Sequence, residues 1–276
     1  RFLKNAKIDI VLAEYGIVGL RALNVCKKAG LPLVVHFHGY DAYMKSTIHQ
    51  YGHLYPEMFS YANAIIAVSA DMKEQLIKLG APPEKVFVNV YGVDVERFSP
   101  ASVSNSNNQL LAVGRLVDKK APYLTILALK KVLKTVPDAR LVIAGNGPLM
   151  DICQKIVQAL HLEKNVSLLG AVAHNEISAL MQNSRAFVQH SLFPASGDAE
   201  GTPNTILEAQ ACALPVISTR HTGIKDVVRH NITGFLVDEG DVDSMANYMI
   251  TLLENPVKAK EMGLAGRMNI QENYTI

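Results

Sequence analysis

The stretch SGDAEGTPNTILEAQACALPVIST (residues 196–219) joins a polar loop to a helix and then to a strand. Thr202 is a favourable N-cap, and Pro203 suits the first helical position because its missing N–H needs no partner there. The helix is predicted over 204–212, and Pro215 ends it before the strand. A loop that leads into a helix N-terminus presents unpaired backbone N–H groups and a positive dipole end, and both suit a phosphate.

Two carboxylates lie on either side of the start of this helix. Glu200 comes before it and Glu208 lies inside it, so we expect them at different depths of one crevice. Taken alone, such a stretch is more often an ordinary amphipathic helix with a capped start than a binding site. Other segments of the chain are needed to distinguish these two interpretations.

Composition excludes several classes of protein. The chain has 276 residues, of which 49% are hydrophobic, and this content excludes a globally disordered protein. Its net charge of +2 lacks the excess of positive charge expected of a nucleic-acid-binding protein. It contains no run of 18 apolar residues that could span a membrane. Cys26, Cys153 and Cys212 lie far apart and form no disulfide framework or metal-binding pair, which is typical of a reducing compartment. We therefore expect a cytoplasmic protein.

Short apolar segments alternate with helical patterns along the chain, which predicts an α/β fold of parallel sheets covered on both faces. The predicted strands are 8–13, 33–37, 64–68, 86–90, 110–113, 139–144, 166–169, 186–189, 216–218 and 234–237. The polar stretch 101–109 has no periodicity and predicts a linker between domains 1–100 and 101–276. Ligands of doubly wound sheets bind at the carboxyl ends of the strands, so two such domains predict a cleft between them.

Cations follow the opening strand of the second predicted domain. In VGRLVDKK (113–120), Arg115 and Lys120 flank the end of this strand, and Gly114 permits a close approach of the backbone. Such a pair can hold a diphosphate, the arginine as a planar fork and the lysine as a point charge. Two surface cations near a turn are the alternative interpretation.

Two further strand ends carry candidate residues. Gly145 and Gly147 permit positive φ or close approach to a ligand, and a plain strand-to-helix turn explains them equally well. A dinucleotide site is not expected there, because the third glycine and the acid of that motif are missing. His38 follows strand 33–37 and could reach the cleft, although a lone histidine there is more often structural. His36 points to the same side, but no further Cys or His is spaced to complete a zinc site.

Together these segments resemble the retaining, family-4 nucleotide-sugar glycosyltransferases of the GT-B fold. The resemblance covers nearly the whole chain and rests on the order and spacing of HFHGYDAY (36–43), AVSADMKEQLIKLGAPPEKVFVNVYGVDVERFSP (67–100), VGRLVDKK, IAGNGP (143–148), EGTPNTILEAQACALPVIST (200–219) and HTGIKDVVRHNITGFLV (221–237). The sequence of residues 196–211 is most similar to that of transferases that build exopolysaccharides of the colanic acid and amylovoran type. The resemblance implies two Rossmann-like domains that face a cleft, the N-terminal one on the acceptor side and the C-terminal one binding the donor.

The resemblance also implies a role for each matching residue. Arg115 and Lys120 match the pair that holds the donor diphosphate and stabilises the leaving charge. Glu208 matches the acid that binds the ribose hydroxyls, Glu200 the acid that faces the donor sugar, and His38 the histidine that reaches this sugar. The other donor-binding positions that it implies are Gly114, Gly145, Gly147, Gly170, Gly201, Thr202, Asn204 and Thr205.

The activity implied is transfer of a sugar from a UDP- or GDP-sugar to a saccharide or lipid-linked saccharide acceptor, with the leaving phosphate helping to take the acceptor's proton. Neither a metal ion nor another cofactor is implied, and a lipid-linked acceptor is compatible with peripheral association at the inner face of the membrane. Ala121 stands where glycine is usual, and Pro203 removes one N–H from the phosphate cradle. The family's glycine-rich N-terminal loop and the end of its last helix are not found, so we expect a fragment with an incomplete N-terminal domain.

Two other functions stay open from the sequence. A nucleotide-sugar epimerase of the same fold would release free sugar without an acceptor, and product analysis would separate it from a transferase. A fragment that binds nucleotide sugar without turnover is the second alternative, and calorimetry would show its binding.

Overall fold

The computed structural model describes residues 6–100 and 108–276. The chain divides into two compact units, one of Arg1–Val90 with Phe193–Thr202 and one of Tyr91–Leu192 with Pro203–Ile276. Residues 101–107 of the predicted linker lie outside the described residues, and the predicted boundary after residue 100 stays a prediction. Among the described residues, no helix is both long enough and apolar enough to cross a bilayer.

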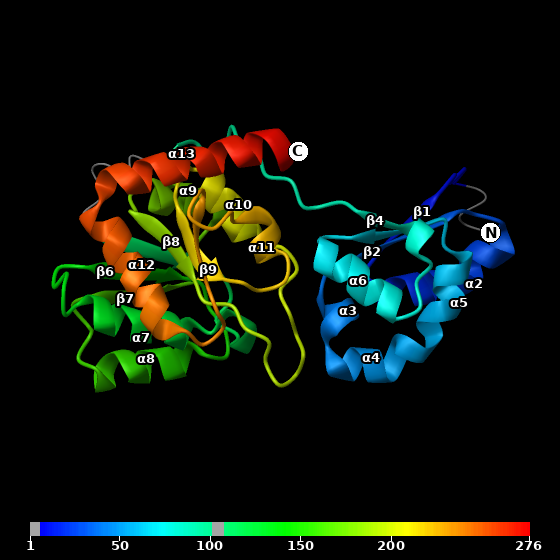
Figure 1. Cartoon of the computed structure of the whole chain (residues 1–276). Helices are drawn as coiled ribbons and strands as arrows, with labels where there is room; N and C mark the ends of the chain where they lie inside the picture. The colour runs from blue at the N-terminus through cyan, green and yellow to red at the C-terminus, as the bar shows by residue number, and fades with distance from the viewer. Residues whose placement is uncertain (1–5, 101–107) are drawn as a thin grey trace. The chain divides into compact units, whose positions relative to one another are not determined.

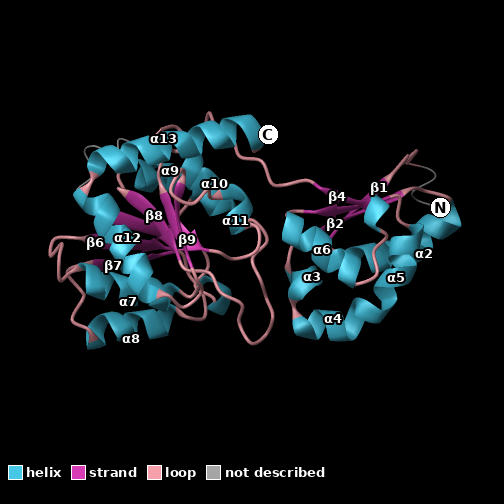
Figure 2. Ribbon diagram, viewed as in Figure 1, coloured by secondary structure: helices cyan, strands magenta, loops and turns pink. Residues whose placement is uncertain are grey.

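Four parallel strands, drawn from blue to cyan in Figure 1, form the sheet of the first unit. Their order is β1-β2-β3-β4. The strands are β1 (Val11–Glu14), β2 (Leu33–Phe37), β3 (Ala64–Ala67) and β4 (Val86–Val88). The helices between them are α2 (Gly16–Ala29), α3 (Tyr40–Tyr43), α4 (Lys45–Tyr51), α5 (Tyr55–Tyr61) and α6 (Ala70–Lys78). In Figure 2 these helices lie on one side of the sheet.

The alternation of side chains along β2 explains which face the helices cover. Val35 and Phe37 are fully buried and point to the helical side, where glycines of α2 allow close packing. A Cβ added at Gly16 would lie 2.5 Å from the Phe37 ring, and one at Gly19 would lie 2.7 Å from Met58 Sδ. Since successive side chains of a strand point to opposite faces, the intervening histidine of β2 lies on the other face.

Six parallel strands form the sheet of the second unit, in the order β10-β9-β8-β5-β6-β7. They are β5 (Gln109–Val113), β6 (Arg140–Ala144), β7 (Val166–Gly170), β8 (Ala186–Gln189), β9 (Val216–Thr219) and β10 (Gly234–Val237). The helices are α7 (Pro122–Val132), α8 (Met150–Ala159), α9 (His174–Gln182), α10 (Asn204–Ala211), α11 (Ile224–Val227), α12 (Val242–Glu254) and α13 (Pro256–Asn273). These bounds confirm the predicted strands, with their ends shifted by a few residues.

Helices cover both faces of the second sheet. Leu110 of β5 belongs to the apolar core that contains Leu129 of α7. The next residue, Leu111, belongs to a separate core that contains Leu207 of α10. Adjacent residues of one strand thus contribute to two cores, which confirms the predicted doubly wound sheet.

The strand order of this sheet creates a switch point beside β5. The chain runs outward from β5 through β6 to β7 and then returns to β8 on the other side of β5. Loops at the carboxyl ends of β5 and β8 therefore leave in opposite directions and open a crevice between them. Ligands of doubly wound sheets bind at such a point.

The start of α10 differs from the sequence prediction. The helix begins at Asn204, and Pro203 is its N-cap in an extended conformation, with φ −65° and ψ 119°. Thr202 is therefore not the N-cap, and its Oγ1 instead donates a hydrogen bond of 3.1 Å to the carbonyl of Val68. The prediction was wrong because the hydroxyl finds an acceptor in a segment that the local sequence does not contain.

Ala121 provides a test of backbone strain at the start of α7. It is buried and left-handed, with φ 33° and ψ 54°. The Cβ of an L-residue in this region meets a carbonyl oxygen, so we expect Ala121→Gly to raise the free energy of unfolding in urea by about 0.5–1 kcal/mol after the entropy cost of glycine. The control Ala128→Gly, buried within α7, should lower it by about 1 kcal/mol. Equal losses from the two substitutions would contradict the strain at Ala121.

Candidate functional site

The loops after β5, β6 and β7 are hydrogen-bonded to one another at the carboxyl edge of the second sheet. Gly114 N donates to the carbonyl of Ala144 at 2.9 Å. Gly145 N donates to the carbonyl of Gly170 at 2.7 Å. Three of the predicted donor-binding glycines thus lie side by side next to the switch point.

Glycine is required in the β6 loop because two backbones meet there. Gly145 has φ 145°, and an added Cβ would lie 1.9 Å from the carbonyl oxygen of Gly114. At Gly147, an added Cβ would lie 2.4 Å from the carbonyl oxygen of Leu116. Both glycines therefore have a structural role, the approach of one loop to another, whether or not a ligand also contacts them.

A cavity of about 380 Å³ opens between these loops and the start of α9. It is lined by Val113, Gly114, Arg115, Ala144, Gly145, Asn146, Ala171, Val172, His174 and Ile177. Ligand sites of proteins commonly span about 300–1,000 Å³ and combine apolar walls with a few polar groups. The cavity thus has the size and lining of a small-molecule site.

The two predicted cations lie at this edge of the sheet. Arg115 is exposed and lines the cavity. Lys120 ends a 3-10 turn over Asp118–Lys120, and its Nζ donates a hydrogen bond of 3.2 Å to Oε1 of Gln189, the last residue of β8. Since Gln189 lies across the switch point from β5, this bond brings the lysine ammonium to the crevice. Arg115, Lys120 and Gln189 also line a smaller adjoining hollow.

The buried carboxylate of α10 reaches the same region through a histidine. Glu208 is 9% exposed, and its Oε1 lies 3.0 Å from Nε2 of His174. His174 is the first residue of α9 and lines the cavity. His174 was not among the residues predicted from the sequence, because a histidine beside a loop carries no signal until α9 is placed next to α10. Its imidazole adds a polar group to a cavity wall that also carries Arg115 and Asn146.

Another histidine that the sequence analysis missed follows β8 directly. His190 is fully buried, and its Nε2 accepts a hydrogen bond of 2.8 Å from Gly240 N. Burial lowers the pKa of His190 to about 4, against the opposing effect of Glu239 and Asp241. The ring is therefore neutral at neutral pH and adds no charge to the crevice.

The remaining candidate residues fall into two groups. Glu200, Gly201 and Thr202 belong with His38 to the first unit, whereas Asn204 and Thr205 begin α10 in the second. Within the first unit, an added Cβ at Gly201 would lie 3.6 Å from the carbonyl oxygen of His38. Glu200 is 8% exposed. The structure thus places the Glu200 loop against the His38 turn, and it places Arg115, Lys120 and Glu208 together in the second unit.

A buried carboxylate fixes the His38 turn. Asp41 is fully buried and accepts hydrogen bonds from the backbone N–H groups of Gly16 (2.7 Å), His38 (3.0 Å) and Gly39 (3.2 Å). Burial raises the pKa of Asp41, and the hydrogen bonds from Gly16 N and His38 N act in the opposite direction. The same side chain therefore holds the start of α2 and the end of β2 in one arrangement.

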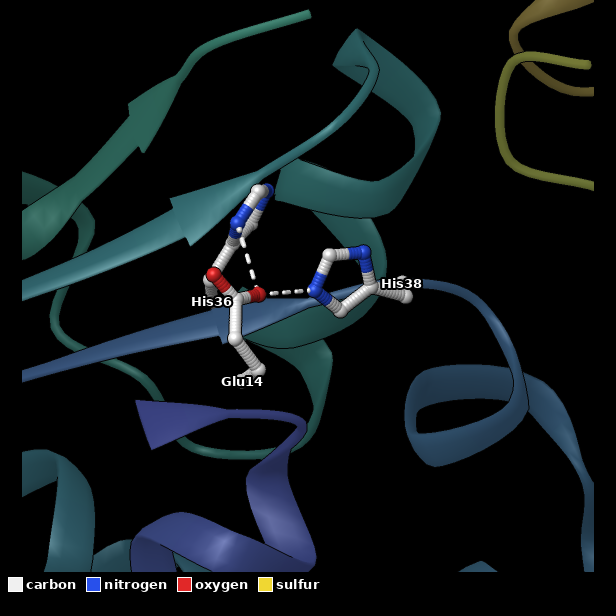
Figure 3. A group of neighbouring side chains, drawn as sticks. All are labelled: Glu14, His36 and His38. Carbon is white, nitrogen blue, oxygen red and sulfur yellow. Dashed lines mark hydrogen bonds and ion pairs between the residues drawn. The ribbon is translucent and has the colours of Figure 1, made fainter. Parts of the chain in front are cut away.

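Glu14, His36 and His38 form a cluster on the face of the first sheet away from its helices (Figure 3). Oε2 of Glu14 lies 3.2 Å from Nδ1 of His36 and 2.5 Å from Nε2 of His38. Burial and the neighbouring His38 lower the pKa of His36, although Glu14 opposes this. No further Cys or His that could complete a metal site with His36 and His38 was expected from the sequence. Glu14 was missed because it lies on the neighbouring strand.

The family comparisons match most of the chain. Residues 94–268 match the family described as "Glycosyl transferases group 1", and residues 1–97 match "Glycosyltransferase Family 4". The amylovoran biosynthesis glycosyltransferase AmsK of Erwinia amylovora is 29% identical over 274 residues, which cover 96% of this chain and 66% of that protein. A UDP-Gal:α-D-GlcNAc-diphosphoundecaprenol α-1,3-galactosyltransferase of Escherichia coli is 31% identical over 276 residues, which cover 93% and 69%.

A solved structure shows the same architecture. HepE of Anabaena in complex with UDP aligns with a TM-score of 0.87 at 21% identity, over 99% of this chain and 77% of that chain. This likeness confirms the predicted fold class, the GT-B fold with two parallel-sheet α/β domains. The chain spans 60% to 66% of the length of the first curated relatives that it matches.

The contact between the β5 and β6 loops generates a stability prediction. We expect Gly145→Ala to lower the free energy of unfolding by about 3 kcal/mol or more, because the new methyl group meets the backbone of the β5 loop. Gly240→Ala is the matched control, since Gly240 also has positive φ, 83°, but an added Cβ would meet nothing within 4 Å. The free energy of unfolding of that control should fall by only about 1 kcal/mol. Urea denaturation measures both, and similar losses would contradict the backbone contact.

Proposed function

The chain belongs to the group 1 glycosyl transferases, and from this premise we propose that it moves a sugar from a nucleoside diphosphate sugar to a saccharide acceptor. The observation that carries the proposal is the pair Arg115 and Lys120 at the switch point of the second sheet, where Lys120 binds Gln189 and Arg115 also lines the adjoining cavity. Departure of a nucleoside diphosphate develops negative charge, and fixed cations at that position stabilise the transition state.

The donor is a UDP- or GDP-sugar, and the second unit holds its nucleotide. The diphosphate lies at Arg115 and Lys120, and the ribose hydroxyls bind the Glu208 carboxylate. The start of α10, with the N–H groups of Asn204 and Thr205, adds a positive helix end. The complex of HepE with UDP supports a uridine nucleotide, and the relative that uses UDP-Gal supports it as well.

The acceptor is a lipid-linked saccharide of polysaccharide biosynthesis. AmsK is named for amylovoran biosynthesis, and the Escherichia coli relative acts on a diphosphoundecaprenol-linked sugar. A lipid-linked acceptor and a soluble donor meet at the cytoplasmic face of a membrane, where we place the reaction.

The reaction retains the configuration of the sugar and proceeds without a metal ion at the diphosphate. His38 and Glu200 face the donor sugar, and the leaving phosphate helps to take the proton of the acceptor hydroxyl. Each cation side chain already offers N–H donors to the phosphate oxygens, so charge is neutralised without an added ion. Full activity after treatment with a chelator, and an anomeric product of unchanged configuration, are the results expected for full-length protein.

Removing either cation tests the transferase directly. We expect Lys120→Ala or Arg115→Ala in the full-length protein to lower kcat by about 10²–10³-fold, the loss found when one preorganised donor to a developing charge is removed. Lys119→Ala is the control, because it removes a cation one residue from Lys120. Kinetics with a panel of UDP- and GDP-sugars, with product analysis, measure the effect. Near-normal turnover of both variants would remove the phosphate role, and free sugar formed without acceptor would indicate an epimerase.

A double-mutant cycle tests the ribose contact. Glu208→Ala should weaken UDP or GDP binding by about tenfold or more, since a hydrogen bond to a charged group is lost. The affinity should fall by the same factor when wild-type protein binds the 2′,3′-dideoxy nucleotide. The variant with the dideoxy nucleotide should bind no more weakly than either single change alone. Calorimetry measures the four affinities. Additive losses of affinity would show that Glu208 does not contact the ribose hydroxyls. Tight nucleotide binding without sugar transfer would indicate a nucleotide-binding protein rather than a transferase.

A further inference from the structure

The cluster of Glu14, His36 and His38 combines the ligand types of a transition-metal site. Glu14 ends β1 and pairs in register with His36 of the parallel strand β2. His38 lies two residues beyond His36, so both imidazoles project to the same face. The three side chains converge there, as Figure 3 shows, and their ligand atoms all lie within 4.8 Å of one another.

We propose that Glu14, His36 and His38 together bind one divalent transition-metal ion of the zinc class. The distances support this. Tetrahedral zinc with bonds of about 2.0–2.1 Å separates its ligand atoms by about 3.3 Å. Oε2 of Glu14 and Nδ1 of His36 are already 3.2 Å apart. The pair Oε2 and Nε2 of His38, at 2.5 Å, needs to open by less than an ångström, which the half-exposed Glu14 side chain can supply.

The backbone that carries the ligands is held in place. Tyr15 N, next to Glu14, donates a hydrogen bond of 2.8 Å to the carbonyl of His36. The buried Asp41 carboxylate binds Gly16 N on one side and His38 N on the other. Ligands fixed in this way lose little freedom on binding, so the site is preorganised for an ion.

The ligand set selects the class of ion. Two imidazoles and one carboxylate suit Zn²⁺, Co²⁺, Ni²⁺ and Cu²⁺, whereas Mg²⁺ and Ca²⁺ prefer oxygen ligands throughout. Three protein ligands leave a fourth position for water. All three ligands belong to the first unit, so binding does not depend on the second unit or on the proposed transfer reaction.

Binding has a consequence that rests on the proposed function. A bound ion would occupy Nε2 of His38, the residue that faces the donor sugar in the proposed reaction. We therefore expect Zn²⁺ to inhibit transfer by the full-length enzyme, and to do so at least about tenfold less potently in His36→Ala, where the ion is held by two ligands.

Cobalt spectroscopy tests the site itself. Chelator-treated full-length protein is titrated with Co²⁺, and a visible absorption band of tetrahedral intensity should rise to one equivalent and disappear when Zn²⁺ is added. Mg²⁺ should not displace the Co²⁺. Glu14→Gln, which keeps the shape of the side chain, and His36→Ala should each weaken the binding by about tenfold or more. His53→Ala, an exposed histidine elsewhere in the same unit, should leave the titration unchanged.

The outcomes separate the metal site from the transferase. Absence of the band, or binding as tight in Glu14→Gln and His36→Ala as in the wild type, would overturn the proposed site. Stoichiometric binding that responds to these variants supports it, and then an uninhibited transfer reaction would count only against the role of His38. Far-UV circular dichroism confirms that each variant is folded.

Discussion

The candidate site depends on the approach of two backbones, the loop after β5 and the loop after β6. No side chain can stand at Gly145, because its Cβ would lie 1.9 Å from the carbonyl oxygen of Gly114. This contact and the hydrogen bond from Gly145 to Gly170 align three strand ends. The cavity, the exposed Arg115 and the turn that carries Lys120 all follow from that alignment. The candidate site is thus built mainly from backbone geometry, with two cations added at its edge.

In the first unit, the buried carboxylate of Asp41 fixes the backbone around the candidate side chains. One buried carboxylate receives three backbone N–H groups and joins the start of α2 to the turn after β2. Orphan N–H groups at a helix start and a turn would otherwise be buried without acceptors, which costs free energy. This arrangement holds the turn that carries His38, whereas the register of β1 with β2 brings Glu14 beside His36. In both units, strand ends that carry candidate side chains such as Arg115 and His38 are fixed by non-local backbone hydrogen bonds.

The sequence is sufficient to predict what depends on local pattern. Apolar runs of four or five residues locate the strands, because a buried parallel strand needs such a run whatever its neighbours. The position of Gly114, Arg115 and Lys120 after β5 was predictable for the same reason, since each lies within seven residues of the end of that strand. Their role toward a ligand stays a prediction.

Contacts between distant segments were not predictable. Thr202 donates to Val68, His174 meets Glu208, and Glu14 meets His36. Each pair depends on which strands and helices become neighbours. The period of apolar residues does not specify that order, so the capping role expected for Thr202 was wrong and the cluster around Glu14 was missed. The position of Glu200 in the first unit was not predictable for the same reason, because its loop contacts Val68, which follows β3, and the His38 turn.

A crystal structure of the full-length protein with bound UDP tests the central claim most directly. The account predicts the diphosphate within hydrogen-bond distance of both Arg115 and Lys120, and the ribose hydroxyls at the Glu208 carboxylate. A nucleotide bound away from the carboxyl ends of β5 and β8, or a diphosphate that contacts neither cation, would contradict it.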